Sequence, residues 1–505
     1  MTADTTADVI VAGGGPVGML LACELRLAGA SVIVLEQLAQ PSGHSRAFRL
    51  QSRTLELFDQ RGLLEPLLAD SKVWPWAHFA GLTPRLDLSR LDSVHPYALL
   101  IPQSRTEAAL ESRAAELGAR IRRGHQLTGL AQDNDGVTAR VAGPSGAYQL
   151  RAQYLVGCDG GRSTTRKAAG IPFEGTAGRA SCLLGDVHLP DPGLLPSGVP
   201  GTLRTETGLL MAVSLEEDVT RILVTEFGRP PAPQDDPVTL DELRDGVRRV
   251  TGTPVGMDEP RWLSRFSDAS LLAANYRTGR VLLAGDAAHV HFPIGAQGLN
   301  LGLQDAMNLG WKLAGVVTGR APDTLLDTYG TERRPAGQRV IDETRTQLEF
   351  MEPGERVSLL REFVAELLAI PQVNLHLSRL VTGLDVRIPA PDHDAGTHPW
   401  VGARAPELTV THPGGRARLA ELMRDGRGVL VDLTCDAGYA AVARPWADRV
   451  ALIAGHADAS EAAALLIRPD GYIAWAAGPD EPAGVPAAGL RAALSRCFGP
   501  VGSQG

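Results

Sequence analysis

The sequence has few of the features that mark disulfide-rich, metal-binding or membrane-spanning proteins. Its five cysteines lie far apart and none forms a CxxC pair, so their spacing indicates neither a disulfide framework nor a structural zinc site. No apolar run of about 18 residues is free of charge and glycine, which excludes a membrane-spanning helix on length. The polar amino terminus lacks the basic segment of a secretory signal peptide. We therefore expect a cytoplasmic protein that has no membrane partner.

An excess of positive charge is also missing. The 49 basic and 58 acidic residues leave a net charge of -9, which argues against nucleic acid as a partner. With 44% hydrophobic residues in 505, the chain has enough apolar material for two or three packed domains. Composition thus predicts a globular, multi-domain protein.

The chain opens with the pattern of a strand, a glycine-rich turn, a helix and a second strand. The buried strand at residues 8–12 runs into GxGxxG, formed by Gly13, Gly15 and Gly18 with Val17 inside it. The first glycine allows the tight turn, the second lets a pyrophosphate approach the backbone, and the third lets helix and strand pack closely. Glu36 ends the second strand, where a carboxylate can accept hydrogen bonds from both ribose hydroxyls. This unit predicts dinucleotide binding, with FAD or NAD fitting better than NADP.

Later parts of the chain change in character. Residues 126–151 alternate apolar and polar side chains and predict an antiparallel ribbon, whereas residues 174–275 form short strand-like runs joined by proline-rich loops. Residues 298–317 have helical periodicity. The segment at 389–399, rich in Pro, Asp and His, is typical of a linker, and about 110 residues with strands and helices follow it.

Two further segments distinguish between the dinucleotides. One is Asp159-Gly160, directly after a buried strand, with two arginines close behind. The other, at residues 285–300, reads GDAAH and then PIGAQGLN as it enters the long helix. Together with the GxGxxG unit, an IPQ segment at 101–103 and TYGTERRP at 328–335, these segments resemble the FAD-dependent aromatic hydroxylases of the para-hydroxybenzoate hydroxylase type. The resemblance covers residues 8 to about 350.

The carboxyl-terminal region resembles a particular branch of that family. The segments at 402–406, 429–433 and 467–475 look like the thioredoxin-like tail of phenol hydroxylases and of hydroxylases that tailor aromatic polyketides. No CxxC occurs there, so scaffolding or association is the alternative to a redox role. The resemblance implies an α/β fold in three parts: a Rossmann-like FAD-binding domain (1–74, 100–175 and 276–388), an inserted sheet-rich substrate-binding domain (75–99 and 176–275) and a thioredoxin-like domain (389–505).

The resemblance also assigns residues to the cofactor. Glu36 would hold the adenosine ribose, Gln103 would contact the ribityl or phosphate region, and Leu127 would offer its backbone to the adenine. Asp286 would bind the ribityl chain or pyrophosphate. Asp159 would support the pyrophosphate and the nicotinamide donor, and Arg46 would contact the FAD and help to handle the pyridine nucleotide.

The loop before the long helix would face the reactive edge of the flavin. By resemblance, the Pro293 backbone would lie beside this edge; it and Arg46 are the only catalytic candidates, since no side-chain acid or base can be named. The helix start at Gly298, Leu299 and Asn300 has unpaired backbone N–H groups and roughly half a positive charge. Placed at the flavin pyrimidine edge, it would stabilise the negative charge that reduction puts there. The family often has Gly-Gly-Gln-Gly where this chain has alanine second, and the added methyl would narrow the loop.

The activity that this resemblance implies is oxygen transfer from a flavin C4a-hydroperoxide, with FAD as cofactor, NAD(P)H as electron donor and O2 as co-substrate. The tail favours a bulky polycyclic aromatic of the polyketide type as substrate. Baeyer–Villiger insertion into a polyketide quinone or ketone, and a rifamycin-inactivating monooxygenase, are the alternatives within the family. An NAD(P)-dependent dehydrogenase and a non-catalytic flavin-binding protein are the alternatives outside it.

Several side chains have two interpretations that the sequence leaves open. Six residues either line a pocket for a flat substrate or pack in the core: Trp74, Trp76, His78, Phe79, Trp262 and Phe266. Asp286, His289 and His291 lie close together in sequence, but the flavin context explains the aspartate, and we expect no metal. The choice of NADH or NADPH and the oligomeric state, a homodimer included, are open.

Overall fold

The computed structural model describes residues 5–69, 71–197, 201–216, 218–233, 236–389, 398–434, 437–457, 461–479 and 486–501. Its largest sheet is built around β1 (Thr6–Ala12), which pairs in parallel with β2 (Val32–Glu36) and β11 (Gly146–Gly157). The strand order β19-β20-β11-β1-β2-β8 is completed by β8 (Arg120–Arg123), β19 (Arg277–Thr278) and β20 (Val281–Leu283). The apolar run in β1 is buried because a parallel sheet is covered on both faces.

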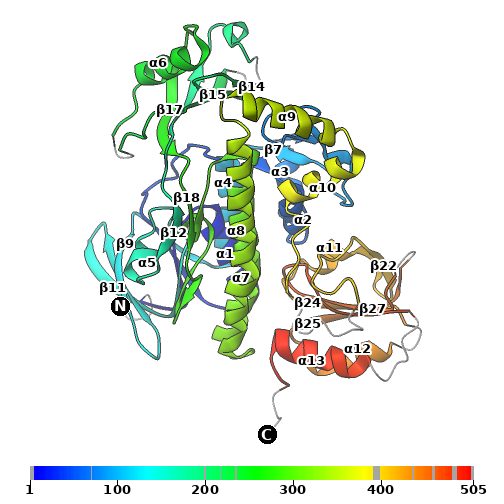
Figure 1. Ribbon diagram of the computed structural model, residues 1–505. Helices are drawn as coiled ribbons and strands as arrows, with labels where there is room; N and C mark the ends of the chain where they lie inside the picture. Colours follow the sequence, from blue (N-terminus) through cyan, green and yellow to red (C-terminus); the bar gives the residue numbers. More distant parts are fainter. Residues whose placement is uncertain are drawn as a thin grey trace.

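Two long helices lie side by side against this sheet. α1 (Pro16–Leu27) packs on α7 (Gly298–Val317), and a Cβ at Gly310 would fall 2.3 Å from Cβ of Glu24, so only glycine permits this approach. The predicted bounds of α7 agree with the structure. α8 (Asp327–Glu349) runs beside α7 through the middle of the molecule (Figure 1). α4 (Gln103–Glu116) packs on the other side of α1.

The predicted antiparallel ribbon extends one edge of the sheet. β9 (Gln126–Gln132) and β10 (Val137–Gly143) pair with each other, and β10 pairs with β11. β11 therefore belongs to the ribbon at its start and to the parallel sheet at its end. The short α5 (Thr164–Ala168) follows it.

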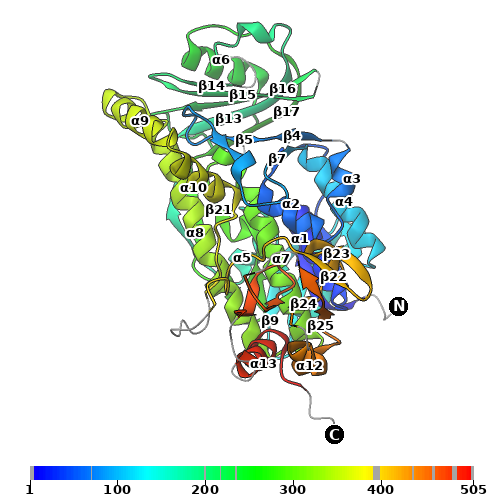
Figure 2. The ribbon, with the colours of Figure 1, turned by 90° about the vertical axis from the view of Figure 1, so that its right-hand side faces the viewer.

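A separate five-stranded sheet stands above the largest sheet and the helices that pack on it (Figures 1 and 2). Its order is β14-β15-β16-β13-β17, and its bounds are β13 (Ser181–His188), β14 (Gly201–Arg204), β15 (Gly208–Glu216), β16 (Val219–Glu226) and β17 (Asp258–Ser267). α6 (Leu240–Thr251) covers one face, where Leu243, Val247 and Val250 are buried. This helix lies in the region that the sequence indicated only as sheet-rich.

A layer of small elements lies between the two sheets. β3 (Arg49–Leu50), β7 (Ala98–Leu100) and β4 (Lys72–Trp74) form one sheet, and β5 (Trp76–Ala77) pairs with β6 (Leu86–Asp87). The helices of this part are α2 (Ser52–Asp59), α3 (Glu65–Leu68), α9 (Glu355–Leu368) and α10 (Pro371–Thr382). A three-stranded sheet on the other side contains β12 (Phe173–Thr176), β18 (Ser270–Ala273) and β21 (His289–Val290).

The carboxyl-terminal part is a small α/β unit. Its central sheet has the order β25-β24-β27-β28, with β24 (Gly428–Asp432), β25 (Val450–Ala454), β27 (Ala464–Ile467) and β28 (Ile473–Ala477). β22 (Thr409–His412), β23 (Gly415–Arg418) and β26 (His456–Ala457) form a second sheet. The helices are α11 (Leu419–Leu422), α12 (Gly438–Ala443) and α13 (Pro486–Phe498). Cys497 is a buried free thiol, and Cys435 lies outside the described residues.

Buried ion pairs attach this unit to the rest of the chain. Arg468 donates to Glu332 of α8 at 2.9 and 2.7 Å and to Asp470 at 3.0 and 2.5 Å. Asn308 of α7 donates to the Asp470 carboxylate at 2.9 Å, and Arg53 of α2 donates to the Asp470 carbonyl at 2.8 Å. The carboxyl-terminal unit is therefore bonded to three helices of the rest of the chain, α2, α7 and α8. In the part of the chain that the structure describes, no helix is both long and apolar enough to span a bilayer.

Candidate active site

A cavity of about 1310 Å³ lies between the glycine-rich turn, the sheet of small elements and the five-stranded sheet. Twelve of the fourteen predicted cofactor residues line it: Gly13, Gly15, Val17, Glu36, Arg46, Gln103, Leu127, Asp159, Asp286, Pro293, Gly298 and Leu299. The chain segments that the sequence singled out thus meet around one space.

The glycine-rich turn is shaped by three different constraints. Gly13 has φ +107°, and a Cβ there would fall 2.3 Å from the Cys158 carbonyl oxygen. A Cβ at Gly18 would fall 2.0 Å from the Gly13 carbonyl oxygen, which explains why Gly18 faces the turn and does not line the cavity. At Gly15, by contrast, a Cβ would meet no atom within 4 Å. The open side of Gly15 leaves the backbone accessible to a ligand.

The first turn of α1 also opens toward the cavity. Gly15 is its N-cap and makes no side-chain cap, and Pro16 occupies the first helical position, which suits its fixed φ. Val17 lines the cavity. The free N–H groups and the positive end of the helix dipole form a site for an anion.

The Glu36 carboxylate is held at the turn by two backbone donors. Gly14 N donates to one oxygen at 2.8 Å and Leu38 N donates to the other at 2.8 Å. The side chain is only partly buried and lines the cavity. The remaining lone pairs are available to hydroxyl donors of a ligand.

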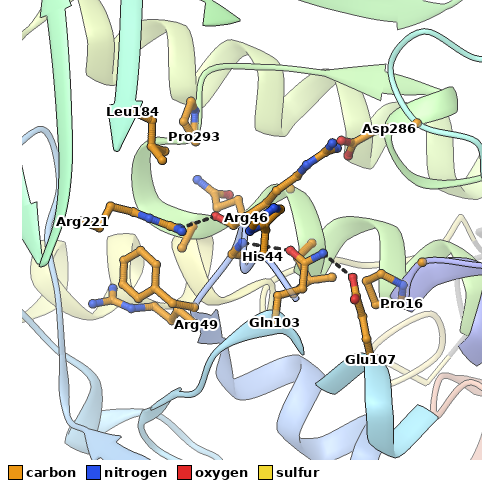
Figure 3. Close-up of a pocket in the computed structure, with 18 of the residues that line it drawn as sticks. Pro16, His44, Arg46, Arg49, Gln103, Glu107, Leu184, Arg221, Asp286 and Pro293 are labelled. Atoms are coloured by element: carbon orange, nitrogen blue, oxygen red, sulfur yellow. Dashed lines mark hydrogen bonds between the residues drawn. The ribbon is translucent and has the colours of Figure 1, made fainter. Parts of the chain in front are cut away.

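Gln103 and Arg46 come from neighbouring segments of the cavity wall (Figure 3). Gln103 accepts a hydrogen bond from Ala47 N at 2.9 Å and donates to Glu107 at 2.7 Å. The Arg46 side chain is exposed in the cavity, while its carbonyl accepts from Arg221 at 2.7 Å. Arg221 also donates to Asp186 at 2.7 and 2.7 Å, so its charge is balanced.

The loop before α7 has an unusual backbone. Gly295 has φ +76° and Ala296 has φ +55°, so the alanine that replaces a family glycine adopts the left-handed conformation. Asn300 accepts from Gln51 N at 2.8 Å and donates to the Arg49 and Ala296 carbonyls at 3.1 and 2.8 Å. The Asn300 side chain therefore holds the loop, and Asn300 is not among the residues that line the cavity, so its cofactor contact stays a prediction.

The start of α7 nevertheless faces the cavity as the sequence indicated. Gly298 and Leu299 line it, and no side chain caps the helix. A second helix N-terminus is thus open to the same space as that of α1.

Asp159 shapes the loop between β11 and α5, and its predicted support of the pyrophosphate and the nicotinamide donor stays a prediction. Its carboxylate accepts from the Ser163 hydroxyl at 2.5 Å and from the Thr165 N–H and hydroxyl at 2.9 and 3.0 Å. These bonds fix the first turn of α5, so the carboxylate stabilises the loop at this part of the cavity wall. Asp286, in contrast, is exposed in the wall of the cavity.

A buried ion network, for which the sequence gives no signal, begins at the cavity wall with His289. His289 and Arg333 both donate to Asp305 at 2.8 Å, and Gly285 N donates to it at 3.1 Å. Burial alone would raise the pKa of Asp305, but Arg333 and His289 hold it below its ordinary value. His289 therefore serves this network rather than a metal site. Among the described residues, no group of three His, Cys, Asp or Glu side chains is placed to hold a metal ion.

The buried carboxyl group of Glu343 supports the loop before α7. Glu343 accepts from Gln297 at 3.0 Å and from Gln347 at 3.1 Å. Burial raises its pKa to about 7, against smaller lowering effects that include the two amides. Gln347 in turn accepts from Ala80 N at 2.9 Å, so the contacts run from the loop to the layer of small elements.

The six aromatic and histidine candidates separate into two groups. Trp74 and His78 line the cavity. Trp262 stacks on His44 with ring centroids 5.7 Å apart, Phe266 packs on Phe292, Phe79 packs on Phe350, and Trp76 is 40% exposed; none of these four lines the cavity.

Comparison with known proteins identifies the class. The FAD binding domain family matches residues 6–344, and the aromatic-ring hydroxylase C-terminal family matches residues 398–501. The chain therefore belongs to the FAD-dependent aromatic hydroxylases. It is a flavoprotein monooxygenase that uses FAD, O2 and a reduced nicotinamide donor. The predicted family, α/β fold class, enzyme class and cofactors are confirmed.

Individual relatives place it more narrowly. It is 46% identical to the 12-dehydrotetracycline 5-monooxygenase/anhydrotetracycline 6-monooxygenase of Streptomyces rimosus, over 98% of this chain and 99% of that protein. It is 45% identical to a rifampicin monooxygenase of Streptomyces venezuelae, over 93% and 95% of the two chains. The solved structure of the anhydrotetracycline hydroxylase OxyS from Streptomyces rimosus superimposes with a TM-score of 0.91 at 46% identity, covering 98% of this chain and 100% of that one.

Proposed function

We propose that the protein hydroxylates a polycyclic aromatic substrate of the polyketide type in the cytoplasm, with FAD bound along the cavity. The observation that carries this proposal is the cavity of about 1310 Å³, which is larger than the usual small-molecule pocket of about 300–1,000 Å³. It has room for a dinucleotide at the glycine-rich turn and for a flat ring system beneath the five-stranded sheet. The relatives are named for 12-dehydrotetracycline, anhydrotetracycline and rifampicin, and these names support a large ring system.

The residues around the cavity fit FAD. We assign the pyrophosphate to the α1 N-terminus, where Gly15 leaves open space, and the adenosine ribose to Glu36. The start of α7 would face the part of the flavin that becomes negative on reduction. Gln103, Arg46, Leu127 and Asp286 would contact the remainder of the cofactor.

FAD, when bound, supplies the chemistry that couples NAD(P)H oxidation to insertion of one oxygen atom of O2, with the other leaving as water. The protein must orient the ring and exclude water from it. The apolar part of the wall, with Leu184, Met211 and Leu223 from the five-stranded sheet, suits this task.

The test is turnover of the purified protein, loaded with FAD, in the presence of anhydrotetracycline and other polycyclic phenols and quinones. We expect faster NAD(P)H oxidation and a product heavier by one oxygen atom with its ring system intact. A product with a new ester linkage would indicate Baeyer–Villiger insertion instead. NAD(P)H oxidation that no aromatic ligand stimulates would overturn the proposal.

A further inference from the structure

Arg49 carries a positive charge into the cavity without a counter-charge. Its side chain lines the cavity, and its Nε atom is buried without a hydrogen-bond partner. Within the ranges that the structure describes, its guanidinium makes no hydrogen bond or ion pair. Arg221, which lines the same cavity, differs in having the Asp186 carboxylate at 2.7 Å. Arg49 is partly buried, and a guanidinium that is withdrawn from water without a partner is costly, so its presence indicates a ligand that completes it.

The backbone fixes where this charge stands. Arg49 lies in β3, opposite Leu100 of β7, which in turn lies opposite Lys72 of β4. The Arg49 carbonyl accepts from Asn300 at the start of α7, and Gln51 donates to the Gly295 carbonyl at 2.9 Å. The strand that presents Arg49 is thus attached to the loop and helix that would face the flavin.

Two neighbours of Arg49, the imidazole of His78 and the charged Arg85, line the same part of the cavity. His78 also lines the cavity, and its Nδ1 atom is buried without a partner among the described residues. Burial, with the charges of Arg49 and Arg85 added, lowers the pKa of His78 to about 4, so the imidazole is neutral at pH 7. Burial lowers the pKa of Arg49 to about 10, which leaves it charged. We call Arg49, His78 and Arg85 the basic recess.

No carboxylate of the cavity, among the residues that the structure describes, is directed to this recess. Glu216 pairs with Arg261 at 2.8 Å, and Asp159 binds its own loop. Glu36, Glu107 and Asp286 belong to the end of the cavity that we assign to FAD. Because the pyrophosphate has its own site at the α1 N-terminus, the recess is left for the substrate.

We propose that Arg49 is a specificity-determining residue that binds an oxyanion of the aromatic substrate, a phenolate, enolate or carboxylate, with the unpartnered Nδ1 side of His78 hydrogen-bonding beside it. This inference rests on the proposed function, since it assigns the chemistry of the substrate in that same cavity. The planar guanidinium suits two adjacent or conjugated oxygens, and a charged hydrogen bond in a buried site discriminates strongly against a neutral analogue.

Calorimetric titration of the full chain tests the inference with three probes of equal ring size. Anthraquinone-2-carboxylate and 1,2-dihydroxyanthraquinone present an acidic group, and anthraquinone-2-carboxamide is the neutral match. We expect the wild type to bind at least one acid more tightly than the amide. Arg49→Gln should weaken binding of that acid by about 10- to 100-fold and leave the amide unchanged. Arg49→Lys, which keeps the charge, should recover part of the loss.

The matched control is Arg90→Gln, which removes the same charge from an exposed position of the neighbouring segment outside the cavity. It should change none of the three affinities. FAD content and melting temperature are measured for each variant and show whether it folds. If Arg49→Gln fails to fold, the affinities of Arg49→Lys for the acids and the amide test the inference in its place.

Two results of the probe titrations would overturn the inference: equal wild-type affinity for the acids and the amide, or an equal loss of affinity for both in Arg49→Gln. A third would come from the same titration with NADPH and NADH, if Arg49→Gln weakened the binding of NADPH alone. The last would assign the recess to a nucleotide phosphate. Calorimetry does not depend on turnover, so failure of the proposed function, seen as absent FAD binding or absent stimulated NAD(P)H oxidation, is read separately.

Discussion

The Glu36 carboxylate accepts a hydrogen bond from the Gly14 N–H at 2.8 Å, which joins the end of β2 to the glycine-rich turn. The contact places an acid beside the turn where we assign the pyrophosphate. Glu36→Gln and Glu36→Ala should weaken FAD binding by about 10- to 100-fold, because a neutral or absent side chain cannot accept from both ribose hydroxyls as strongly. Fluorescence titration of the apoprotein with FAD measures this, with the exposed Glu65→Gln as control. Unchanged affinity in both Glu36 variants would mean that the ribose lies elsewhere.

The glycine turn offers a pair of substitutions that separate ligand binding from folding. Gly15→Ala meets no protein atom within 4 Å, so its melting temperature should stay near that of the wild type while FAD affinity falls more than about tenfold. Gly18→Ala would press on the Gly13 carbonyl and should destabilise the fold by about 1–3 kcal/mol or more. If Gly15→Ala retains full FAD affinity, the pyrophosphate does not approach this turn.

Glu343 predicts a dependence of stability on pH. Burial raises its folded-state pKa to about 7, above the ordinary 4.5, so its contribution is present below pH 4.5 and is lost as pH rises through 7. The difference corresponds to about 2–4 kcal/mol. Glu343→Gln removes this titration and should melt close to the wild type at pH 5 but several degrees higher at pH 8. The exposed Glu366→Gln should show no such change. If the difference in melting temperature between Glu343→Gln and the wild type is the same at pH 5 and pH 8, the assignment is refuted.

The buried Arg468 holds the carboxyl-terminal unit to α8. Arg468→Met leaves Glu332 and Asp470 with less compensation and should destabilise the protein by about 3–5 kcal/mol. Arg427→Met breaks a pair with Asp425 that is about half exposed, and should change stability by about 1 kcal/mol at most. Thermal melting and limited proteolysis compare the two; similar behaviour of both variants would show that the buried network does not fasten the unit.

The sequence predicted those parts of the site in which neighbouring residues carry the signal. The glycine spacing, the acid at the end of the second strand and the helix from Gly298 to Val317 are all local patterns, and the structure places them around one cavity. Fold class followed from the same units in order along the chain. The domain boundaries and the individual cofactor contacts stay predictions.

What the sequence could not show depends on contacts between distant residues. Asp305 gave no signal because its partners, His289 and Arg333, come from β21 and from α8. The role of Asp159 depends on how the chain turns into α5, which brings Ser163 and Thr165 to its carboxylate. No spacing distinguishes the unpaired Arg49 from the paired Arg221. For an aromatic side chain such as Trp262, the sequence alone does not distinguish packing in the core from lining a pocket.

The most direct test is to titrate FAD into the folded apoprotein and into Gly15→Ala and to record the flavin absorbance and stoichiometry. The account predicts a yellow wild-type protein that binds one FAD per chain, and a folded variant that binds it more weakly. A folded wild-type chain that retains no FAD even in excess would contradict the account.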